Sequence, residues 1–151
     1  MNDLRELYQE TILGHNKKPR NFRVIQDASH EADGHNPLCG DQLTLYAKLA
    51  SDGTLEDVAF QGTGCAISRA SASLMTDFVK GKALAEVDAD FERFHDLVTS
   101  PPSEEAKTEG LGKLAVFSGV REYPMRVKCA TLAWHALRAA LEGDGKAAKT
   151  E

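Results

Sequence analysis

The chain contains three cysteines, and each lies where a thiolate could bind a metal. Cys39 belongs to the turn-like segment Asn-Pro-Leu-Cys-Gly-Asp at 36–41, Cys65 follows Gly-Thr-Gly, and Cys129 lies near the start of a helix-like run. With Asp41 they make four potential ligands, the number that a tetrahedral zinc site requires. A carboxylate is a poorer ligand for a thiophilic metal than a fourth thiolate. We therefore predict a fold that brings three distant cysteines together at a site able to exchange a ligand.

Length and charge exclude several classes of protein. A chain of 151 residues is long enough for one domain with one core, and we expect this domain at 1–143 with a flexible tail at 144–151. Eighteen basic against 23 acidic residues argue against nucleic acid as a partner. We expect no membrane partner, since no apolar run approaches the roughly 20 residues of a membrane span. An odd number of cysteines without a secretion signal indicates reduced thiols and a cytoplasmic location.

An alternating pattern in the middle of the chain predicts an antiparallel hairpin. Residues 42–49 alternate apolar and polar side chains, which indicates a strand with one face exposed to solvent. Ser-Asp-Gly at 51–53 is typical of a turn, and a second alternating run ends at Gly62. Because the turn points away from Cys39 and Cys65, the open end of the hairpin brings these two cysteines together.

Apolar residues at helical spacing predict helices on both sides of this hairpin. We expect them at 4–13, 65–80 and 90–98, as one turn at 114–117, and from about 129 to 141. Residues 14–40 are polar without a sustained period, apart from a short strand at 22–25, and we interpret them as a mobile or functional connection. Residues 103–112 are expected to form an exposed loop.

Two of the cysteines are expected at helix N-termini. There the unpaired N–H groups and the helix dipole favour negative charge, which lowers the pKa of a thiol below its usual value of about 8.5. Cys65 and Cys129 would both gain from this effect, and Arg126 and Lys128 add positive charge beside Cys129. These cations would partly neutralise the negative charge of a zinc ion held by three thiolates and a carboxylate.

Simpler interpretations of the same residues stay open at this point. A buried cysteine is often a small apolar residue with no reactivity. Gly40 would let Cys39 and Asp41 face one point, but an aspartate here also suits an ordinary turn or helix cap. The two cations can form a solvated basic edge, and His35, four residues before Cys39, can be a surface histidine.

The cysteine-centred motifs resemble those of the SufU branch of the IscU/NifU-like family of iron–sulfur cluster assembly proteins. The resemblance runs from about Leu4 to Leu141 and is strongest in four stretches, at 8–13, 36–41, 62–68 and 126–134. In the IscU branch a histidine precedes the last cysteine, whereas this chain has Lys128. Residues 101–120 occupy the place of an insert that the SufU branch carries. Both features favour the SufU branch.

This resemblance implies a fold, a metal and a partner. The implied fold is a single α+β domain, in which helices pack on a small three-stranded antiparallel sheet. The implied metal is zinc held by Cys39, Asp41, Cys65 and Cys129, and the implied sulfur donor is a PLP-dependent cysteine desulfurase of the SufS type. Downstream iron–sulfur assembly proteins would then receive the sulfur.

Three functions are consistent with this set of residues. We expect a zinc-dependent sulfur acceptor, that is, a sulfurtransferase, with Cys39 as the acceptor because a loop residue moves at low cost. Arg126 would stabilise the persulfide formed on Cys39. The first alternative is a scaffold on which an iron–sulfur cluster is assembled on the same cysteines. The second is a non-enzymatic module with a structural zinc, although such sites usually have four Cys or His ligands.

Overall fold

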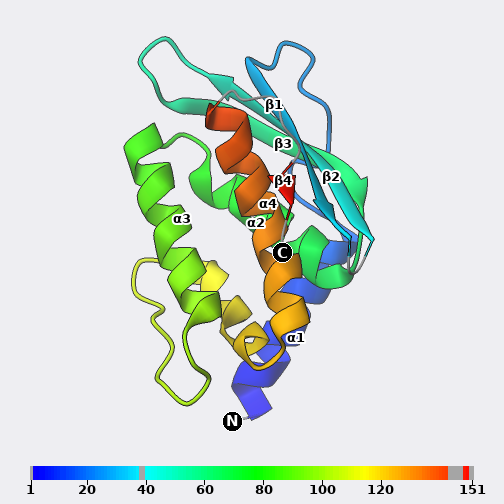
Figure 1. The fold of residues 1–151 in the computed structure, drawn as a ribbon, viewed down its shortest axis with the longest axis vertical. Helices are drawn as coiled ribbons and strands as arrows, with labels where there is room; N and C mark the ends of the chain where they lie inside the picture. Colours follow the sequence, from blue (N-terminus) through cyan, green and yellow to red (C-terminus); the bar gives the residue numbers. More distant parts are fainter. Residues whose placement is uncertain (1, 38–39, 143–147, 150–151) are drawn as a thin grey trace.

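The computed structural model describes residues 2–37, 40–142 and 148–149. The elements, in chain order, are α1 (Asn2–Lys17), β1 (His30–Asn36), β2 (Asp41–Leu49), β3 (Leu55–Thr63), α2 (Ala66–Val79), α3 (Leu84–Thr99), the 3₁₀ helix η1 (Gly112–Glu122), α4 (Pro124–Glu142) and the two-residue β4 (Ala148–Lys149). Figure 1 shows the sheet on one side of the domain, with the helices gathered against it. The expected α+β fold is therefore confirmed.

The three main strands form an antiparallel meander. β2 pairs with β1 on one side and with β3 on the other, and β4 adds a short parallel pairing at the free edge of β1. The predicted hairpin is β2–β3, and its register places Gln42 opposite Thr63 at the open end. The predicted tail includes β4, while residues 143–147 and 150–151 lie outside the described part of the chain, so the tail stays a prediction.

Strand β1 lies inside the segment that the sequence analysis interpreted as a connection. Its buried positions are Ala32, Gly34 and Asn36, which give no apolar alternation to detect. A Cβ atom at Gly34 would lie 3.2 Å from Leu132 Cδ1 and 3.3 Å from Ala136 Cβ. Glycine at residue 34 therefore suits the close approach of α4 to β1. The small side chains that fit this packing also explain why the sequence gives no recognisable strand pattern here.

The core lies between the sheet and the two helices α2 and α4, which both contact the strands (Figure 1). Fully buried Leu45, Phe60, Met75 and Leu132 contribute from both layers. Such burial of apolar side chains supplies the main stabilising term of the fold. Helices α3 and η1 extend the core through an aromatic cluster, in which Phe94 stacks on Trp134 at 5.1 Å and meets Phe117 edge-on at 5.7 Å.

Several helices are longer than their apolar periodicity indicates. α1 continues to Lys17, α3 begins at Leu84 and α4 begins at Pro124. Proline is well tolerated in the first turn of a helix, since its missing N–H would have no partner inside the helix. α4 therefore begins five residues before Cys129, which changes the environment of that cysteine.

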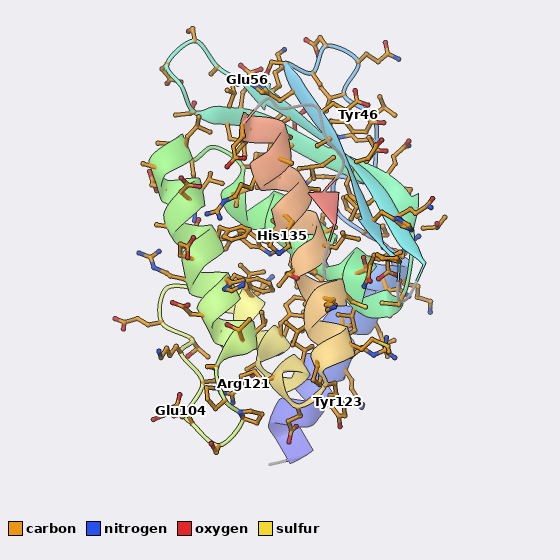
Figure 2. All side chains as sticks on the ribbon, in the orientation of Figure 1. Tyr46, Glu56, Glu104, Arg121, Tyr123 and His135 are labelled. Carbon is orange, nitrogen blue, oxygen red and sulfur yellow. The ribbon has the colours of Figure 1, made fainter. Side chains whose placement is uncertain are left out.

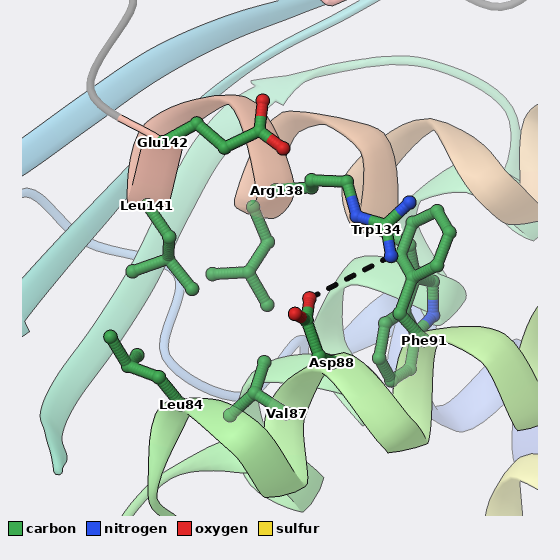
Figure 3. Close-up of a pocket in the computed structure, with 9 residues that line it drawn as sticks. Leu84, Val87, Asp88, Phe91, Trp134, Arg138, Leu141 and Glu142 are labelled. Atoms are coloured by element: carbon green, nitrogen blue, oxygen red, sulfur yellow. Dashed lines mark ion pairs between the residues drawn. The ribbon is translucent and has the colours of Figure 1, made fainter.

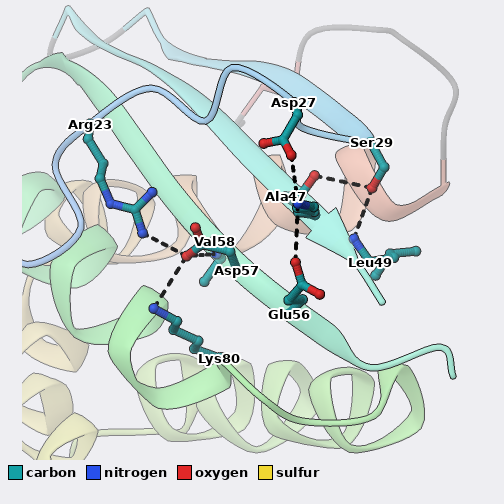
Figure 4. Close-up of polar contacts among 10 residues, drawn as sticks. Arg23, Asp27, Ser29, Ala47, Leu49, Glu56, Asp57, Val58 and Lys80 are labelled. Carbon is teal, nitrogen blue, oxygen red and sulfur yellow. Dashed lines mark hydrogen bonds and ion pairs between the residues drawn. The ribbon is translucent and has the colours of Figure 1, made fainter. Parts of the chain in front are cut away.

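Polar contacts fasten part of the 14–40 segment to the sheet. Arg23 forms an ion pair with Asp57 on β3 at 2.7 Å, and Lys48 on β2 reaches Asp27 at 2.6 Å (Figure 4). Exposed ion pairs contribute little stability. The backbone of this segment is also bound to the sheet, because the N–H of Arg23 donates to the carbonyl of Phe60 at 3.0 Å. The connection thus follows the edge of β3.

The loop between α3 and η1 is anchored by one guanidinium group. Arg121 donates hydrogen bonds to the carbonyls of Pro101 (3.2 Å) and Glu104 (2.9 Å) and to Oγ of Ser100 (3.2 Å). Figure 2 shows Arg121 and Glu104 at the same end of the domain as Tyr123, the residue before α4. Exposed residues predominate in this loop, as expected, but its first part is held to the end of η1.

Candidate metal centre

The structure brings three of the four predicted ligands together. One ligand atom from each of Asp41, Cys65 and Cys129 lies within 4.8 Å of the others. Asp41 begins β2, Cys65 precedes α2, and Cys129 lies in α4. The pairing of β2 with β3 carries Asp41 to the start of α2, and α4 packs against both α2 and the sheet. The cluster is therefore produced by the fold, from residues up to 88 positions apart.

Asp41 is fully buried, and its two carboxylate oxygens have different surroundings. Oδ1 accepts a hydrogen bond from the backbone N–H of Cys65 at 2.8 Å, while Oδ2 lies 3.8 Å from the sulfur of Cys65. Gly64 makes this approach possible, because a Cβ atom there would lie 2.8 Å from Oδ1. A buried carboxylate needs such donors or a cation to offset its desolvation. One oxygen is held by the backbone, and the other faces the sulfurs.

Cys65 is the N-cap residue of α2. Its sulfur accepts a hydrogen bond from the backbone N–H of Ser68 at 3.5 Å, as a cap residue does. A hydrogen bond from Cys129, together with this N–H, lowers the pKa of the Cys65 thiol from 9.0 to about 6, although burial and the charge of Asp41 act in the opposite direction. The expectation of a thiolate-stabilising helix N-terminus is confirmed for this cysteine.

The same expectation is wrong for Cys129. It is the sixth residue of α4, and the helix-terminal N–H groups of Arg126 and Val127 already donate to the carbonyl of Tyr123. Only the first four N–H groups of a helix lack an intrahelical partner. The sulfur of Cys129 instead lies 3.7 Å from the side-chain amide nitrogen of Asn36, which donates a hydrogen bond to it.

The spacing of Asp41 and Cys65 matches that of two ligands of one metal ion. Bonds of about 2.3 Å to sulfur and 2.0–2.2 Å to oxygen place the ligands of zinc roughly 3.5–4 Å from one another. The observed separation between Oδ2 of Asp41 and the sulfur of Cys65 is 3.8 Å, and among the described residues neither Cys65 nor Cys129 is in a disulfide. Two soft sulfurs and one hard oxygen suit zinc, with a fourth position for a further ligand.

The other predicted site residues are placed less directly. Cys39 lies outside the described residues. On either side of it, the N–H of Gly40 donates to the carbonyl of Asn36 at 2.9 Å, and Gly40 has a φ of 72°, which favours glycine. Arg126 is exposed in the first turn of α4, three positions before Cys129, and Lys128 is half-buried. His35 occupies the opposite side of β1 from buried Asn36.

A cavity of about 160 Å³ lies elsewhere, between α3 and α4. Its apolar wall includes Leu84, Val87 and Leu141, and an ion pair of 3.6 Å between Asp88 and Arg138 crosses its rim (Figure 3). Small-molecule sites usually measure 300–1,000 Å³. This cavity is too small for such a ligand and shares no residue with the metal cluster.

None of the helices in the described part of the chain has the length and apolar character of a membrane span.

The chain is similar to known proteins over a stretch that includes Asp41, Cys65 and Cys129. Residues 7–130 match the family of the NifU-like N-terminal domain. The chain belongs to this family. It is therefore one of the iron–sulfur cluster assembly proteins of the SufU/IscU type, and the cluster of Asp41, Cys65 and Cys129 is its candidate metal-binding site.

Relatives within the NifU-like family divide between two roles. The zinc-dependent sulfurtransferase SufU of Bacillus subtilis (strain 168) is 41% identical over 135 residues, 89% of each chain. The iron–sulfur cluster assembly scaffold protein IscU of Streptococcus pyogenes serotype M1 is 37% identical over 147 residues, 97% of this chain and 90% of the relative. Sequence identity alone thus supports both functions of the family.

Solved structures of the same type share the fold. The crystal structure of a candidate iron–sulfur cluster assembly scaffold protein for the SUF system, from the thermophile Fervidobacterium islandicum AW-1, superposes with a TM-score of 0.80 at 34% identity. It covers 90% of this chain and 97% of that one. The three-stranded sheet with packed helices is therefore the family fold.

Sequence reasoning missed Asn36 at this NifU-type site. The residue stands at the head of the motif that contains Cys39 and Asp41, but the motif alone does not show where its amide points. The available signal was its position in step with Ala32 and Gly34, which places it on the face of β1 that α4 covers.

Proposed function

We propose that this protein is a zinc-dependent sulfur acceptor of iron–sulfur cluster assembly. It would take persulfide sulfur from a PLP-dependent cysteine desulfurase of the SufS type and deliver it to downstream assembly proteins. The observation that carries the proposal is the mixed donor set, in which a buried carboxylate lies within 4.8 Å of two cysteine sulfurs that form no disulfide among the described residues. A structural zinc site would usually offer four Cys or His ligands.

Two sequence features support the acceptor over the scaffold. Lys128 replaces the histidine that the resemblance associates with the IscU branch, and an ammonium group is not a metal ligand. Residues 101–120 occupy the place of the insert that the resemblance associates with the SufU branch, and Arg121 of η1 binds the carbonyls of Pro101 and Glu104 in it. The SufU relative of Bacillus subtilis is described as zinc-dependent and as a sulfurtransferase, in agreement with the proposal.

Each cysteine of the site, and Asp41, would have a defined role in sulfur transfer. Asp41, Cys65 and Cys129 would hold zinc together with Cys39. When bound, zinc keeps its thiolate ligands deprotonated and limits their oxidation. Cys39 would leave its ligand position, and its thiolate would attack the outer sulfur of the desulfurase persulfide. The sulfur–sulfur bond of the donor breaks, its thiolate departs, and the persulfide is then carried by Cys39.

Two residues support this step without binding the metal. Gly40 joins Cys39 to Asp41, and its positive φ gives the chain a sharp bend between them. Arg126, exposed on the first turn of α4, would stabilise the negative charge of the Cys39 persulfide. Cysteine chemistry of this kind requires a thiolate and access for the partner.

A cluster scaffold is the second candidate. It is favoured by the IscU relative of Streptococcus pyogenes, which aligns with 97% of this chain. The same thiols would then bind a transient iron–sulfur cluster as cargo. Mixed ligand sets can hold such clusters, although cysteines predominate.

The deciding experiment compares metal content and sulfur transfer in one protein sample. The protein is purified with and without oxygen and analysed for zinc, iron and sulfide. It is then incubated with a SufS-type desulfurase and sulfur-labelled cysteine. We expect about one zinc per chain in both samples, stimulation of the desulfurase, and labelled sulfur on Cys39. A cluster in the anaerobic sample, without stimulation of the desulfurase, would establish the scaffold function instead.

A further inference from the structure

Asn36 links the first strand to the metal centre through a side-chain contact. Its side chain is fully buried at the end of β1, and its amide nitrogen lies 3.7 Å from the sulfur of Cys129. The carbonyl of Asn36 accepts the N–H of Gly40, which closes the turn toward Asp41. The backbone of Asn36 therefore closes the turn, while its side chain donates a hydrogen bond to the sulfur of Cys129, a predicted metal ligand.

The two described sulfurs obtain their N–H donors in different ways. Cys65 caps α2, so the helix itself provides the N–H of Ser68 at 3.5 Å. Cys129 lies in the second turn of α4, where backbone N–H groups are used within the helix. A donor to its sulfur must therefore come from another element, and Asn36 is the residue that supplies it.

A hydrogen bond to a ligand sulfur has chemical consequences. It fixes the orientation of the ligand and draws electron density from the sulfur lone pairs, which makes the sulfur a weaker nucleophile. An amide group keeps its protons over the whole physiological pH range, so this donor is permanent. The buried position of Asn36 also excludes water, which would otherwise compete for the sulfur.

We propose that Asn36 is a positioning residue of the metal centre, whose amide holds the sulfur of Cys129 as a permanent ligand while sulfur is transferred at another cysteine. This inference rests on the proposed metal site. It adds a residue outside the ligand set and assigns it a role in deciding which cysteine reacts. No bond to Asn36 forms or breaks during transfer.

The first test observes the hydrogen bond in the wild-type protein. Zinc is replaced by ¹¹³Cd, and NMR is used to detect scalar coupling from an amide proton through sulfur to the metal. We expect coupling from the Asn36 side-chain amide. The backbone N–H of Ser68, which donates to Cys65, is the internal control. Coupling from Ser68 without coupling from Asn36 would overturn the proposal, and this result needs no variant to fold.

The second test removes the donor. Asn36→Leu keeps the size of the side chain, and Asn36→Ala serves as a smaller replacement. We expect the zinc dissociation constant to rise about 10- to 100-fold in both. In the cobalt-substituted protein, the sulfur-to-metal charge-transfer band should move to lower energy, because the sulfur lone pairs are no longer stabilised. In the zinc-loaded protein, alkylation at Cys129 should become faster.

The matched control is Thr131→Val. Thr131 is buried in α4 two residues after Cys129, and its hydroxyl donates to the carbonyl of Val127 at 3.0 Å within the helix. The control should keep the wild-type charge-transfer band and zinc affinity. Wild-type values in both Asn36 variants would refute the role of Asn36. Failure of the wild-type protein to bind zinc or cobalt would instead refute the metal site on which the inference rests.

Discussion

The backbone N–H of Cys65 donates a hydrogen bond to Oδ1 of Asp41 at 2.8 Å. This bond joins the first residue of β2 to the cap of α2, so the carboxylate is oriented by the protein itself. One carboxylate oxygen is thereby used, and the other is left on the side of the sulfurs, 3.8 Å from Cys65. The carboxylate of Asp41 therefore holds its position without a metal, which suits the ligand role proposed for it.

Replacement of Asp41 should separate its two roles. Asp41→Asn keeps an acceptor for the Cys65 N–H but loses the negative charge, whereas Asp41→Ala loses both. We expect both variants to lose most desulfurase stimulation and part of their zinc. Only Asp41→Ala should lose about 1–3 kcal/mol of unfolding free energy in the metal-free protein, since it leaves a buried N–H without an acceptor. Full activity with full zinc in either variant would contradict the ligand assignment.

Removal of zinc should lower the melting temperature. At free zinc a thousandfold above its dissociation constant, binding adds about 4 kcal/mol to the free energy of unfolding. For a domain of this size, each kcal/mol corresponds to roughly 2–4 °C. Calorimetry before and after chelation should therefore show a fall of roughly 8–16 °C, reversed by added zinc and not by magnesium. An unchanged melting curve would show that zinc does not bind the folded state.

Cys39 should be the residue that receives sulfur. We expect Cys39→Ala to abolish stimulation of the desulfurase and the labelling of the protein, while circular dichroism shows an unchanged fold. Zinc binding should weaken without being lost, because Asp41, Cys65 and Cys129 remain. The comparison variant is Cys65→Ala, which should lose zinc more severely. Labelled sulfur on Cys39→Ala at the wild-type rate would assign the acceptor to another thiol.

The thiol of Cys65 should titrate near pH 6 in the metal-free protein. Its pKa is lowered from 9.0 to about 6, mainly by the hydrogen bond from Cys129. Alkylation with iodoacetamide, resolved by mass spectrometry of the Cys65 peptide, should give a midpoint near pH 6. In Cys129→Ala this midpoint should move to higher pH, because residue 129 no longer donates a hydrogen bond to the Cys65 sulfur. A midpoint near 9 in the wild-type protein would contradict the assigned environment.

The lowered pKa of Cys65 should also make the stability of the metal-free protein depend on pH. The folded state holds the Cys65 thiolate more strongly than the unfolded state does, so its contribution to stability is complete above pH 9. It is lost progressively as the pH falls from 9 to about 6. Chemical unfolding of the metal-free protein across this range should show that loss in the wild type and a smaller one in Cys65→Ala.

The predictable part of this fold is the part whose pattern is local. The β2–β3 hairpin and α2 were predicted because alternating and 3.6-residue periods determine them. The ligand residues Asp41, Cys65 and Cys129 were found because cysteines are few and lie in recognisable motifs. Arg126 as a stabilising cation and Cys39 as the acceptor stay predictions.

The rest depended on tertiary contacts that a sequence does not display. β1 was missed because its inner face consists of small or polar residues such as Ala32 and Gly34. The start of α4 was placed too late, since Pro124 and its neighbours are exposed and add nothing to an apolar period. That error assigned Cys129 to a helix N-terminus and so concealed the need for Asn36.

The missing side chain at Gly34 bears on the spacing between β1 and α4 beside the candidate metal centre. A methyl group there would press on Leu132 and Ala136 at 3.2–3.3 Å, so α4 would have to yield by a few tenths of an ångström. Asn36 lies two residues along the same strand face, and Cys129 lies one turn before Leu132 in the same helix. We therefore expect a larger residue at position 34 to move the Asn36 amide away from the Cys129 sulfur, without changing the chemistry of either group.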